Sequence, residues 1–164
     1  MSETNDMLHH FSKDMILDHC DCKTYDDMLR FASDYLYEKG CVKETFKEAI
    51  LKREEEYFTG LRCDFTGDLF NVGIPHTYPE HVITPGVFVI KMDEPIDARE
   101  MGTDDGTVEN VRFIFMLLLE QHSDSHLKML QGLIAMFQNE DRMKELGEAK
   151  TVDEIYAVIE KSFS

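Results

Sequence analysis

The run of residues 111–119, VRFIFMLLL, constrains the fold of this chain more than any other segment. Apart from Arg112 it is apolar at every position, so both sides of an extended strand would carry apolar side chains. Such a strand needs cover on both faces, which is the situation of a central strand between two layers of helices. The sequence therefore predicts an α/β fold, a single domain with a mixed β-sheet flanked by α-helices on both faces.

Apolar residues recur at helical spacing in several other segments. Thr24 is expected to cap the first helix, with Asp26 and Asp27 in its first turn, and Thr151 with Glu154 resembles a capping box that opens the last helix. Helices are expected at residues 24–39, 43–56, 126–138, 141–146 and 151–161, strands at 14–17, 69–74, 86–92 and 111–119, and polar or turn-rich connections at 57–68, 77–85 and 93–107.

The length of 164 residues fits one domain with an ordinary hydrophobic core. Residues 1–12 mix charges and histidines with few apolar side chains. They are expected to form a loose N-terminal leader, followed by one domain over residues 13–164.

The chain is strongly acidic, with 33 aspartate and glutamate residues against 17 lysine and arginine residues and a formal net charge of −16. A surface of this charge repels phosphates, so DNA, RNA and anionic lipid surfaces are not expected as partners. The longest apolar run, residues 113–119, is far shorter than the ~20 residues that span a bilayer, which argues against direct membrane insertion. Proteins with basic faces are the expected partners.

Four cysteines follow an N-terminus that lacks the basic and then apolar pattern of a secretory signal: Cys20, Cys22, Cys41 and Cys63. Reduced thiols in a cytoplasmic protein are the simplest interpretation. The motif His19-Cys20-Asp21-Cys22 has no second pair at zinc-ligand spacing, so structural thiols are favoured over a metal site.

Residues 53–81 bring unlike residues close together in the sequence. A charged helical end leads into a turn-rich segment, and a short apolar run then stops at Pro75, which His76 follows directly. Proline lacks an N–H and has a fixed φ, so His76 is expected on a turn at the end of a strand. α/β folds often carry working residues at such strand ends, although a lone histidine there can equally be a packed turn residue.

Three groups of residues in this segment carry a family resemblance: Arg53-Glu54, Thr59-Gly60-Leu61 and Gly73-Ile74-Pro75-His76-Thr77. In this order they resemble the enzyme IIA (EIIA) domains of the bacterial phosphoenolpyruvate-dependent sugar phosphotransferase system. Within the fructose/mannitol-type superfamily, the galactitol-like branch is nearest. The resemblance extends over roughly residues 16–159 and implies the same α/β architecture.

The resemblance implies a phosphocarrier of sugar uptake in which His76 is the phosphoryl acceptor. His76 would take a phosphoryl group from phospho-HPr, at Nε2, and pass it to a cysteine of an enzyme IIB, which serves the membrane enzyme IIC. No metal or organic cofactor is implied, and galactitol or a related polyol or sugar is the implied cargo. Histidine suits this role because a fixed acceptor on one ring nitrogen leaves the other basic and pointing outward.

Several nearby residues are candidates for stabilising the phosphoryl group. Arg53 can present a planar fork of N–H donors to two oxygens, or it can form a helix-surface ion pair with Glu56. Thr59, Gly60 and Thr77 can offer hydroxyl or backbone N–H donors, and their alternative role is simply to form turns.

His126 is expected in the first turn of a helix capped by residues 123–125, where free N–H groups and the helix dipole attract anions. Mannitol- and fructose-type relatives carry a second active-site histidine at the matching position, which is not the phosphate acceptor. Galactitol-like relatives often carry another polar residue there, so a surface role is the alternative. His81 and His122 are expected on the surface.

Two other functions stay open. A regulatory EIIA-like module would use phosphorylation of His76 to report sugar status to a protein partner. A metalloprotein would use His76, His81, His122 and His126. Because His122 and His126 straddle an expected helix start, none of these pairs has the helical i, i+4 arrangement with a carboxylate that a zinc hydrolase needs.

For a carrier, both partners need access to the same histidine nitrogen, so they are expected to share one face around His76. This face is expected to include Phe58, Tyr78, Leu127 and Met129, and the alternative is that these residues belong to the core.

Overall fold

A mixed five-stranded sheet forms the centre of the computed structural model, which describes residues 7–121 and 125–163. Its strand order is β1-β4-β5-β3-β2. The strands are β1 (Ile16–Leu17), β2 (Gly60–Leu61), β3 (Asn71–Gly73), β4 (Gly86–Arg99) and β5 (Thr107–Leu118). β1 with β4 and β3 with β5 are parallel pairs, whereas β4 with β5 and β2 with β3 are antiparallel. The predicted mixed sheet is confirmed.

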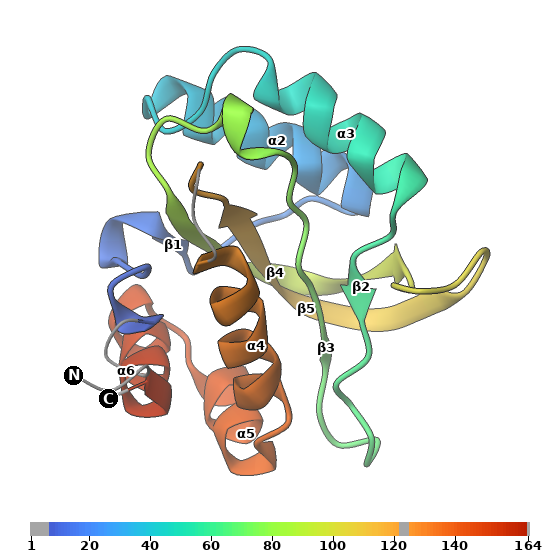
Figure 1. The fold of residues 1–164 in the computed structure, drawn as a ribbon. Helices are drawn as coiled ribbons and strands as arrows, with labels where there is room; N and C mark the ends of the chain where they lie inside the picture. Colours follow the sequence, from blue (N-terminus) through green and yellow to red (C-terminus); the bar gives the residue numbers. More distant parts are fainter. Residues whose placement is uncertain (1–6, 122–124, 164) are drawn as a thin grey trace.

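Helices cover both faces of the sheet, as predicted (Figure 1). α2 (Tyr25–Glu38) and α3 (Phe46–Glu56) lie on one face. α4 (Ser125–Phe137), α5 (Glu140–Glu148) and α6 (Val152–Phe163) lie on the other. Two short 3₁₀ turns, η1 (Lys13–Met15) and η2 (Pro79–His81), precede β1 and β4.

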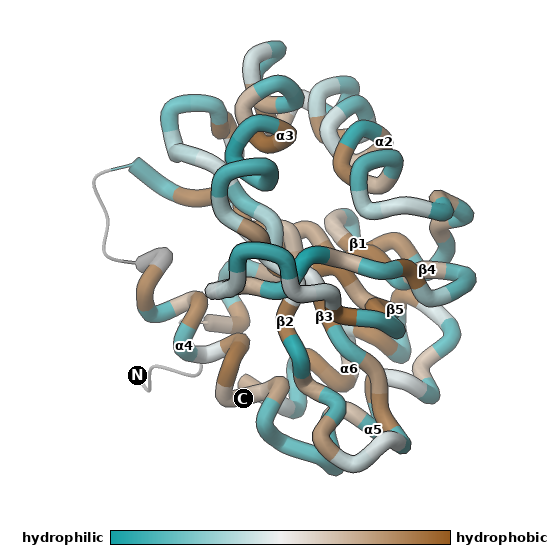
Figure 2. Tube along the Cα trace, turned by 90° about the vertical axis from the view of Figure 1, so that its right-hand side faces the viewer, coloured by the Kyte–Doolittle hydropathy of each residue, from teal (hydrophilic) through white to brown (hydrophobic). Residues whose placement is uncertain are grey.

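The sheet divides the core into two clusters. Side chains of β5 alternate between them: Phe113 and Phe115 pack with α4, α5 and α6, whereas Ile114 and Met116 pack with α2 and α3. All four side chains are fully buried. β5 is therefore apolar on both sides because both sides are covered. Figure 2 shows brown, hydrophobic stretches along the long strands, while the helices alternate between brown and teal.

Two helix starts follow the predicted capping chemistry. Oγ1 of Thr24 accepts a hydrogen bond from the N–H of Asp27 at 3.1 Å, which caps α2. Oγ1 of Thr151 accepts from the N–H of Glu154 at 3.1 Å at the start of α6, and the same hydroxyl lies 3.3 Å from the Glu154 carboxylate. Both predicted caps are confirmed.

The β4–β5 hairpin is longer than the sequence predicts. Residues 93–107 are expected as a polar connection, but β4 continues to Arg99 and β5 already begins at Thr107. Ile96 and Ala98 are buried in the α2–α3 cluster and alternate with exposed Asp97 and Arg99. This is the period-two pattern of a strand with one covered face, and the acidic residues on its exposed face hide it in the sequence.

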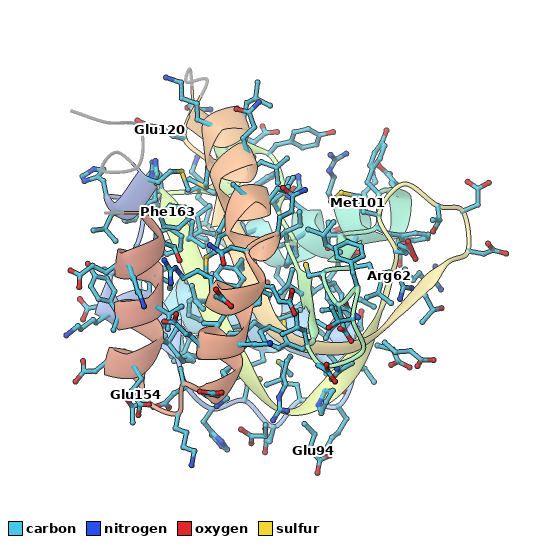
Figure 3. The ribbon with its side chains drawn as sticks, turned by 90° about the horizontal axis from the view of Figure 1, so that it is seen from below. Arg62, Glu94, Met101, Glu120, Glu154 and Phe163 are labelled. Atoms are coloured by element: carbon cyan, nitrogen blue, oxygen red, sulfur yellow. The ribbon has the colours of Figure 1, made fainter. Side chains whose placement is uncertain are left out.

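The segment of residues 57–68 also differs from its prediction as a connection, because it contains β2. Gly60 pairs with Gly73 and Leu61 with Val72. The end of the β4–β5 hairpin is hydrogen-bonded to β2, because the N–H of Met101 donates to the carbonyl of Gly60 at 2.8 Å. Arg62 and Met101 lie toward the same end of the molecule in Figure 3. Pairing with distant residues, rather than local sequence, makes β2 a strand.

Several boundaries shift. The predicted strand over residues 69–74 is shorter and covers Asn71–Gly73, and the predicted strand over 14–17 begins instead with η1. α3 begins at Phe46 rather than at residue 43. Within the expected leader, Met7 and Phe11 are buried, and the Phe11 ring stacks on Phe163 at 5.6 Å between centroids. The domain boundary at residue 12 stays a prediction.

Candidate active site

His76 lies at the C-terminal edge of the parallel strands β3 and β5. It forms a parallel bridge with Leu117, and the N–H of Leu117 donates to the carbonyl of Pro75 at 3.0 Å. Pro75 has no N–H to donate to the ladder, so regular strand pairing ends before it and His76 pairs only through this isolated bridge. His76 lies just beyond the end of β3, as predicted, but in a segment that still bridges to Leu117 rather than on the predicted turn.

The half-buried ring of His76 is held by the backbone just before it. Nδ1 lies 2.9 Å from the carbonyl oxygen of Ile74. A carbonyl oxygen can only accept, so Nδ1 must carry the hydrogen and donate it. In the neutral ring the lone pair then belongs to Nε2. The backbone thus selects the tautomer in which Nε2 is the nucleophilic nitrogen.

Arg53 connects the last turn of α3 with the segment that follows His76. Its guanidinium carbon lies 4.0 Å from the ring centroid of Tyr57 and 5.5 Å from that of Tyr78, the second residue after His76. Stacking of a guanidinium on aromatic rings leaves its N–H edges available to oxygen acceptors. In the part of the chain that the structure describes, no ion pair joins Arg53 to Glu56. The geometry therefore favours a planar cation held beside the His76 segment.

Thr77 has a buried hydroxyl. The residue is only 2% exposed, and its Oγ1 has no hydrogen-bond partner among the described residues. A buried hydroxyl that makes no hydrogen bond carries a desolvation cost of about 1–3 kcal/mol. Thr77 directly follows His76 in the chain, and a role of its hydroxyl in binding phosphate stays a prediction.

Thr59 is engaged within the protein. Its N–H donates to Oε2 of Glu54 at 2.9 Å, and its hydroxyl donates to Oε1 of the same carboxylate. The hydroxyl oxygen also lies 2.6 Å from the hydroxyl of Tyr25, which must then be the donor of that bond. Both hydrogens of Thr59 are used by Glu54. The structure thus gives Thr59 no donor for a phosphoryl group.

Gly60 packs closely against the end of β4. A Cβ at this position would lie 2.6 Å from the carbonyl oxygen of Arg99 and 2.8 Å from the Cβ of Ala98. No side chain fits there without a shift of the backbone. This close approach explains the glycine, and a role of Gly60 in binding phosphate stays a prediction.

The three remaining candidate histidines differ in how far the structure describes them. The backbone of His126 lies in the first turn of α4, as predicted, but its side chain is outside the described structure. His122 lies outside the described residues. His81 Nδ1 lies 2.7 Å from Oγ1 of Thr45, and its Nε2 lies 3.8 Å from the Glu80 carboxylate. His81 is thus held by the segment before α3.

The expected docking face is only partly exposed. Tyr78 and Leu127 are exposed, at 55% and 54%. Met129 is 1% exposed and belongs to the core between the sheet and α4. Phe58 is half-buried, with the Arg99 guanidinium 5.1 Å from its ring centroid. Tyr57, which is 57% exposed, is the additional aromatic residue beside Arg53.

Neither a metal-binding cluster nor a membrane-spanning helix occurs among the described residues. Among the side chains that the structure describes, which do not include that of His126, no group of three or more histidine, cysteine, aspartate or glutamate residues is arranged to hold a metal ion. None of the described helices is long and apolar enough to cross a bilayer.

Residues 9–162 match the model of one protein family, described as "Phosphoenolpyruvate-dependent sugar phosphotransferase system, EIIA 2". The chain belongs to this EIIA family. It is a phosphotransferase component that carries phosphate between proteins. The resemblance carried by residues 53–77 is thereby confirmed at the level of the family.

Curated relatives of this EIIA are named for three different sugars. A fructose-specific EIIABC component of Bacillus subtilis is 29% identical over 71% of this chain, which spans only 17% of that longer protein. A fructose-specific EIIA component of Haloferax volcanii is 28% identical over 83% of this chain and 82% of its own length. The galactitol-specific EIIA component of Escherichia coli K12 is 22% identical over 73% and 75%. The third sugar is mannitol, for which an EIIA component of Enterococcus faecalis is named. These relatives do not single out galactitol.

The fold of this EIIA is also that of solved EIIA structures. A complex of the E. coli mannitol EIIA with phosphorylated mannitol EIIB matches 91% of this chain and 96% of the matched chain. The TM-score is 0.70 and the sequence identity is 20%. At this identity the likeness establishes the fold alone.

Sequence reasoning missed two residues that support the site of this EIIA, Glu54 and Tyr25. Burial raises the pKa of Glu54 to about 7, although its hydrogen bonds to Thr59 and the charges of Arg53 and Arg99 lower it. One signal for Glu54 was present: it continues the buried stripe of α3 formed by Phe46 and Ile50, at a spacing of four residues. A carboxylate on a buried stripe needs partners. Those partners come from other elements, which the stripe does not identify.

Proposed function

We propose that this EIIA accepts a phosphoryl group from phospho-HPr on Nε2 of His76 and passes it to a cysteine of an EIIB. The proposal rests on one observation above all, the hydrogen bond from Nδ1 of His76 to the carbonyl of Ile74. It directs the lone pair to Nε2, so the ring can attack without first losing a proton.

Both transfer steps then balance without proton movement on the ring. In the first, a bond forms between Nε2 and phosphorus while the bond between phosphorus and the donor breaks. The ring becomes cationic, and the Ile74 carbonyl that already accepts the Nδ1 hydrogen stabilises this charge. In the second, the thiolate of an EIIB cysteine forms the bond to phosphorus, the bond to Nε2 breaks, and the neutral ring returns.

Phosphoryl transfer passes through a loose transition state that needs charge stabilisation more than covalent help. Arg53, held between Tyr57 and Tyr78, can offer two parallel N–H donors to the phosphoryl oxygens. The buried hydroxyl of Thr77 can donate to a third oxygen. His126, in the first turn of α4, and the N–H groups of that turn are further candidates.

The partner proteins would approach the exposed aromatic surface formed by Tyr57 and Tyr78, next to His76. The structural neighbour in complex with a phosphorylated EIIB supports an EIIB as acceptor. The net charge of −16 suits donors with basic faces. A carrier between such proteins would act in the cytoplasm and supply a membrane EIIC. Galactitol or a related polyol or sugar remains the proposed cargo. Because other relatives are fructose- or mannitol-specific, fructose and mannitol are the alternative cargoes.

The test is phosphoryl transfer from phosphoenolpyruvate through purified enzyme I and HPr, followed by intact mass. The native protein should gain one phosphoryl group, and His76→Ala should gain none. His81→Ala is the matched control, because His81 is held by Thr45 and should not affect transfer. Phosphorus NMR of the product should show the phosphoryl group on Nε2. Absence of any mass gain on the native chain, or undiminished gain on His76→Ala, would overturn the assignment.

A further inference from the structure

We propose that Glu54 is a positioning residue for His76, acting through a chain of hydrogen bonds that runs from its carboxylate through Thr59 and Ile74 to the histidine ring. The proposal rests on the role of His76 proposed above. Glu54 touches neither the ring nor any phosphoryl group in this arrangement; its effect is to fix the carbonyl that selects the ring tautomer.

The first link joins the end of α3 to the start of β2. The Glu54 carboxylate accepts from both the N–H and the hydroxyl of Thr59. These two bonds hold both the backbone N–H and the side chain of Thr59 in place. Since both Thr59 groups donate, the ionised carboxylate is the form that satisfies both of them.

The second link crosses from β2 to β3. The carbonyl of Thr59 accepts from the N–H of Ile74 at 3.0 Å, and the carbonyl of Ile74 accepts from Nδ1 of His76 at 2.9 Å. Thr59 is 3% exposed and Ile74 is fully buried, so water cannot readily replace either partner. A shift of Thr59 is therefore expected to move the backbone of Ile74, and with it the carbonyl that accepts from the histidine.

Tyr25, on α2, supports this series of hydrogen bonds. Its hydroxyl donates to Oγ1 of Thr59 at 2.6 Å, and its ring packs on β3 so closely that a Cβ on Gly73 would lie 2.5 Å from the hydroxyl oxygen. The three side chains of Glu54, Thr59 and Tyr25 thus tie α2, α3 and β2 to the end of β3. Hydrogen bonds behind a reactive imidazole orient its ring and hold its geometry.

The alternative interpretation, that Glu54 belongs to a ligand-binding site, explains its contacts less well. Glu54 lines a pocket of about 470 Å³ together with Tyr25, Asp97 and Arg99. A pocket with several acidic residues suggests a cationic ligand, but the Glu54 carboxylate already has partners at both oxygens. Its described contacts lead toward His76 rather than into the pocket, and this direction favours positioning over ligand binding.

The test compares Glu54→Ala with Glu55→Ala, its neighbour on the same helix, in the full chain. The first readout is the ¹⁵N NMR spectrum of the His76 ring in unphosphorylated protein, on the alkaline side of its titration. Native protein and Glu55→Ala should show the tautomer with hydrogen on Nδ1. Glu54→Ala should show a mixture of both tautomers. The second readout is the rate of phosphorylation by phospho-HPr, which should fall about tenfold in Glu54→Ala and remain unchanged in Glu55→Ala.

Glu54→Gln serves as the conservative rescue, because an amide can still accept one Thr59 donor and donate to its hydroxyl. It should restore most of the native tautomer ratio and rate. Should Glu54→Ala fail to fold, Glu54→Asp takes its place: it keeps the charge but is one methylene too short to hold both Thr59 groups, and it should also show mixed tautomers. An unchanged tautomer ratio in whichever of these two variants folds would overturn the proposal. If native protein accepts no phosphate, the proposed function fails, while the tautomer measurement still decides the role of Glu54.

Discussion

The ring of His76 donates its Nδ1 hydrogen to a carbonyl only two residues earlier. Arg53 arrives from α3 and is held between Tyr57 and Tyr78. Thr77 contributes a buried hydroxyl without a described partner. A local bond therefore sets the ring tautomer, and in the proposed function Arg53 would supply positive charge and Thr77 a hydrogen-bond donor to the phosphoryl group.

Arg53→Lys should slow phosphorylation by phospho-HPr roughly tenfold to a hundredfold. Lysine keeps the charge but loses both the planar fork and the stacking on two tyrosine rings. Stopped transfer reactions analysed by intact mass give the rate. Arg62→Lys is the control, since Arg62 pairs with Glu100 and the Thr107 carbonyl at the hairpin. Equal rates for native protein and Arg53→Lys would contradict a phosphate-binding role.

Thr77→Val should make the unphosphorylated protein more stable, by about 1 kcal/mol, because it removes a buried hydroxyl that has no described partner. The same change should slow phosphoryl transfer, because the phosphoryl group loses a donor. Urea denaturation and the transfer assay measure the two effects. Thr59→Val is the contrasting variant: its hydroxyl is bonded to Glu54 and Tyr25, so its loss should destabilise the protein. A destabilised Thr77→Val would show that its hydroxyl has a partner in the folded protein.

Among the elements, the junction of α3, β2 and β3 includes the partly buried carboxylate of Glu54. Glu54 ends the buried stripe of α3 and binds the start of β2 through Thr59. Charged or titratable groups face it from three elements: Tyr25 and Asp26 on α2, Arg53 and Glu55 on α3, and Asp97 and Arg99 on β4. Burial outweighs the neighbouring arginines and raises the pKa of Glu54 to about 7.

The raised pKa of Glu54 predicts how stability changes with pH. Below its ordinary value of 4.5 the carboxyl is protonated in both the folded and the unfolded chain. Between this value and about 7 the unfolded chain releases the proton while the folded protein retains it, so the free energy of unfolding decreases as pH rises. The loss should be on the order of 1–3 kcal/mol and complete above the folded pKa.

Glu54→Gln should lack this component, because glutamine does not titrate. Urea denaturation at pH 5 and pH 8 gives the free energy of unfolding for each protein. The decrease between the two conditions should be smaller in Glu54→Gln than in native protein, and it should keep its native size in Glu55→Gln. The same decrease in native protein and Glu54→Gln would assign the titration to other groups.

In the molecule as a whole, the sheet separates two hydrophobic cores. The α4–α6 core also includes Met7 and Phe11, and the stacking of Phe11 on Phe163 ties the described start of the chain to its last helix. Figure 1 shows this blue segment beside the red helix α6. Residues close to the N-terminus therefore contribute to the stability of the domain.

Phe11→Ala should destabilise the protein by about 3 kcal/mol, because it removes a large buried ring and leaves a cavity against Phe163. Phe65→Ala is the control: Phe65 is 76% exposed, and its loss should change stability by less than about 0.5 kcal/mol. Thermal denaturation of both variants checks the difference. Phosphoryl transfer at low temperature should be retained in Phe11→Ala, since Phe11 is not one of the residues proposed to accept or bind the phosphoryl group.

Much of the fold and part of the site were predictable from local sequence. The cap at Thr24, the buried strand around Phe115 and the end of β3 before Pro75 depend on neighbouring residues, so their signals survive in a single sequence. The hairpin over residues 93–107 was missed because acidic side chains on one face concealed the buried Ile96 and Ala98 on the other.

The chain itself determined the elements with strong periodicity, the order of the helices and strands, and the place of His76 directly after the proline that follows β3. Only the tertiary structure decided that Thr59 is bound by Glu54 instead of offering donors to phosphate, and that Phe11 belongs to the core. It also decided the pKa of Glu54, through burial beneath α2 and β4. The physical reason is the separation of the interacting residues along the sequence. Helix caps and hydrophobic periodicity depend on residues that are neighbours in sequence, whereas burial and hydrogen-bond partners come from segments that only folding brings together.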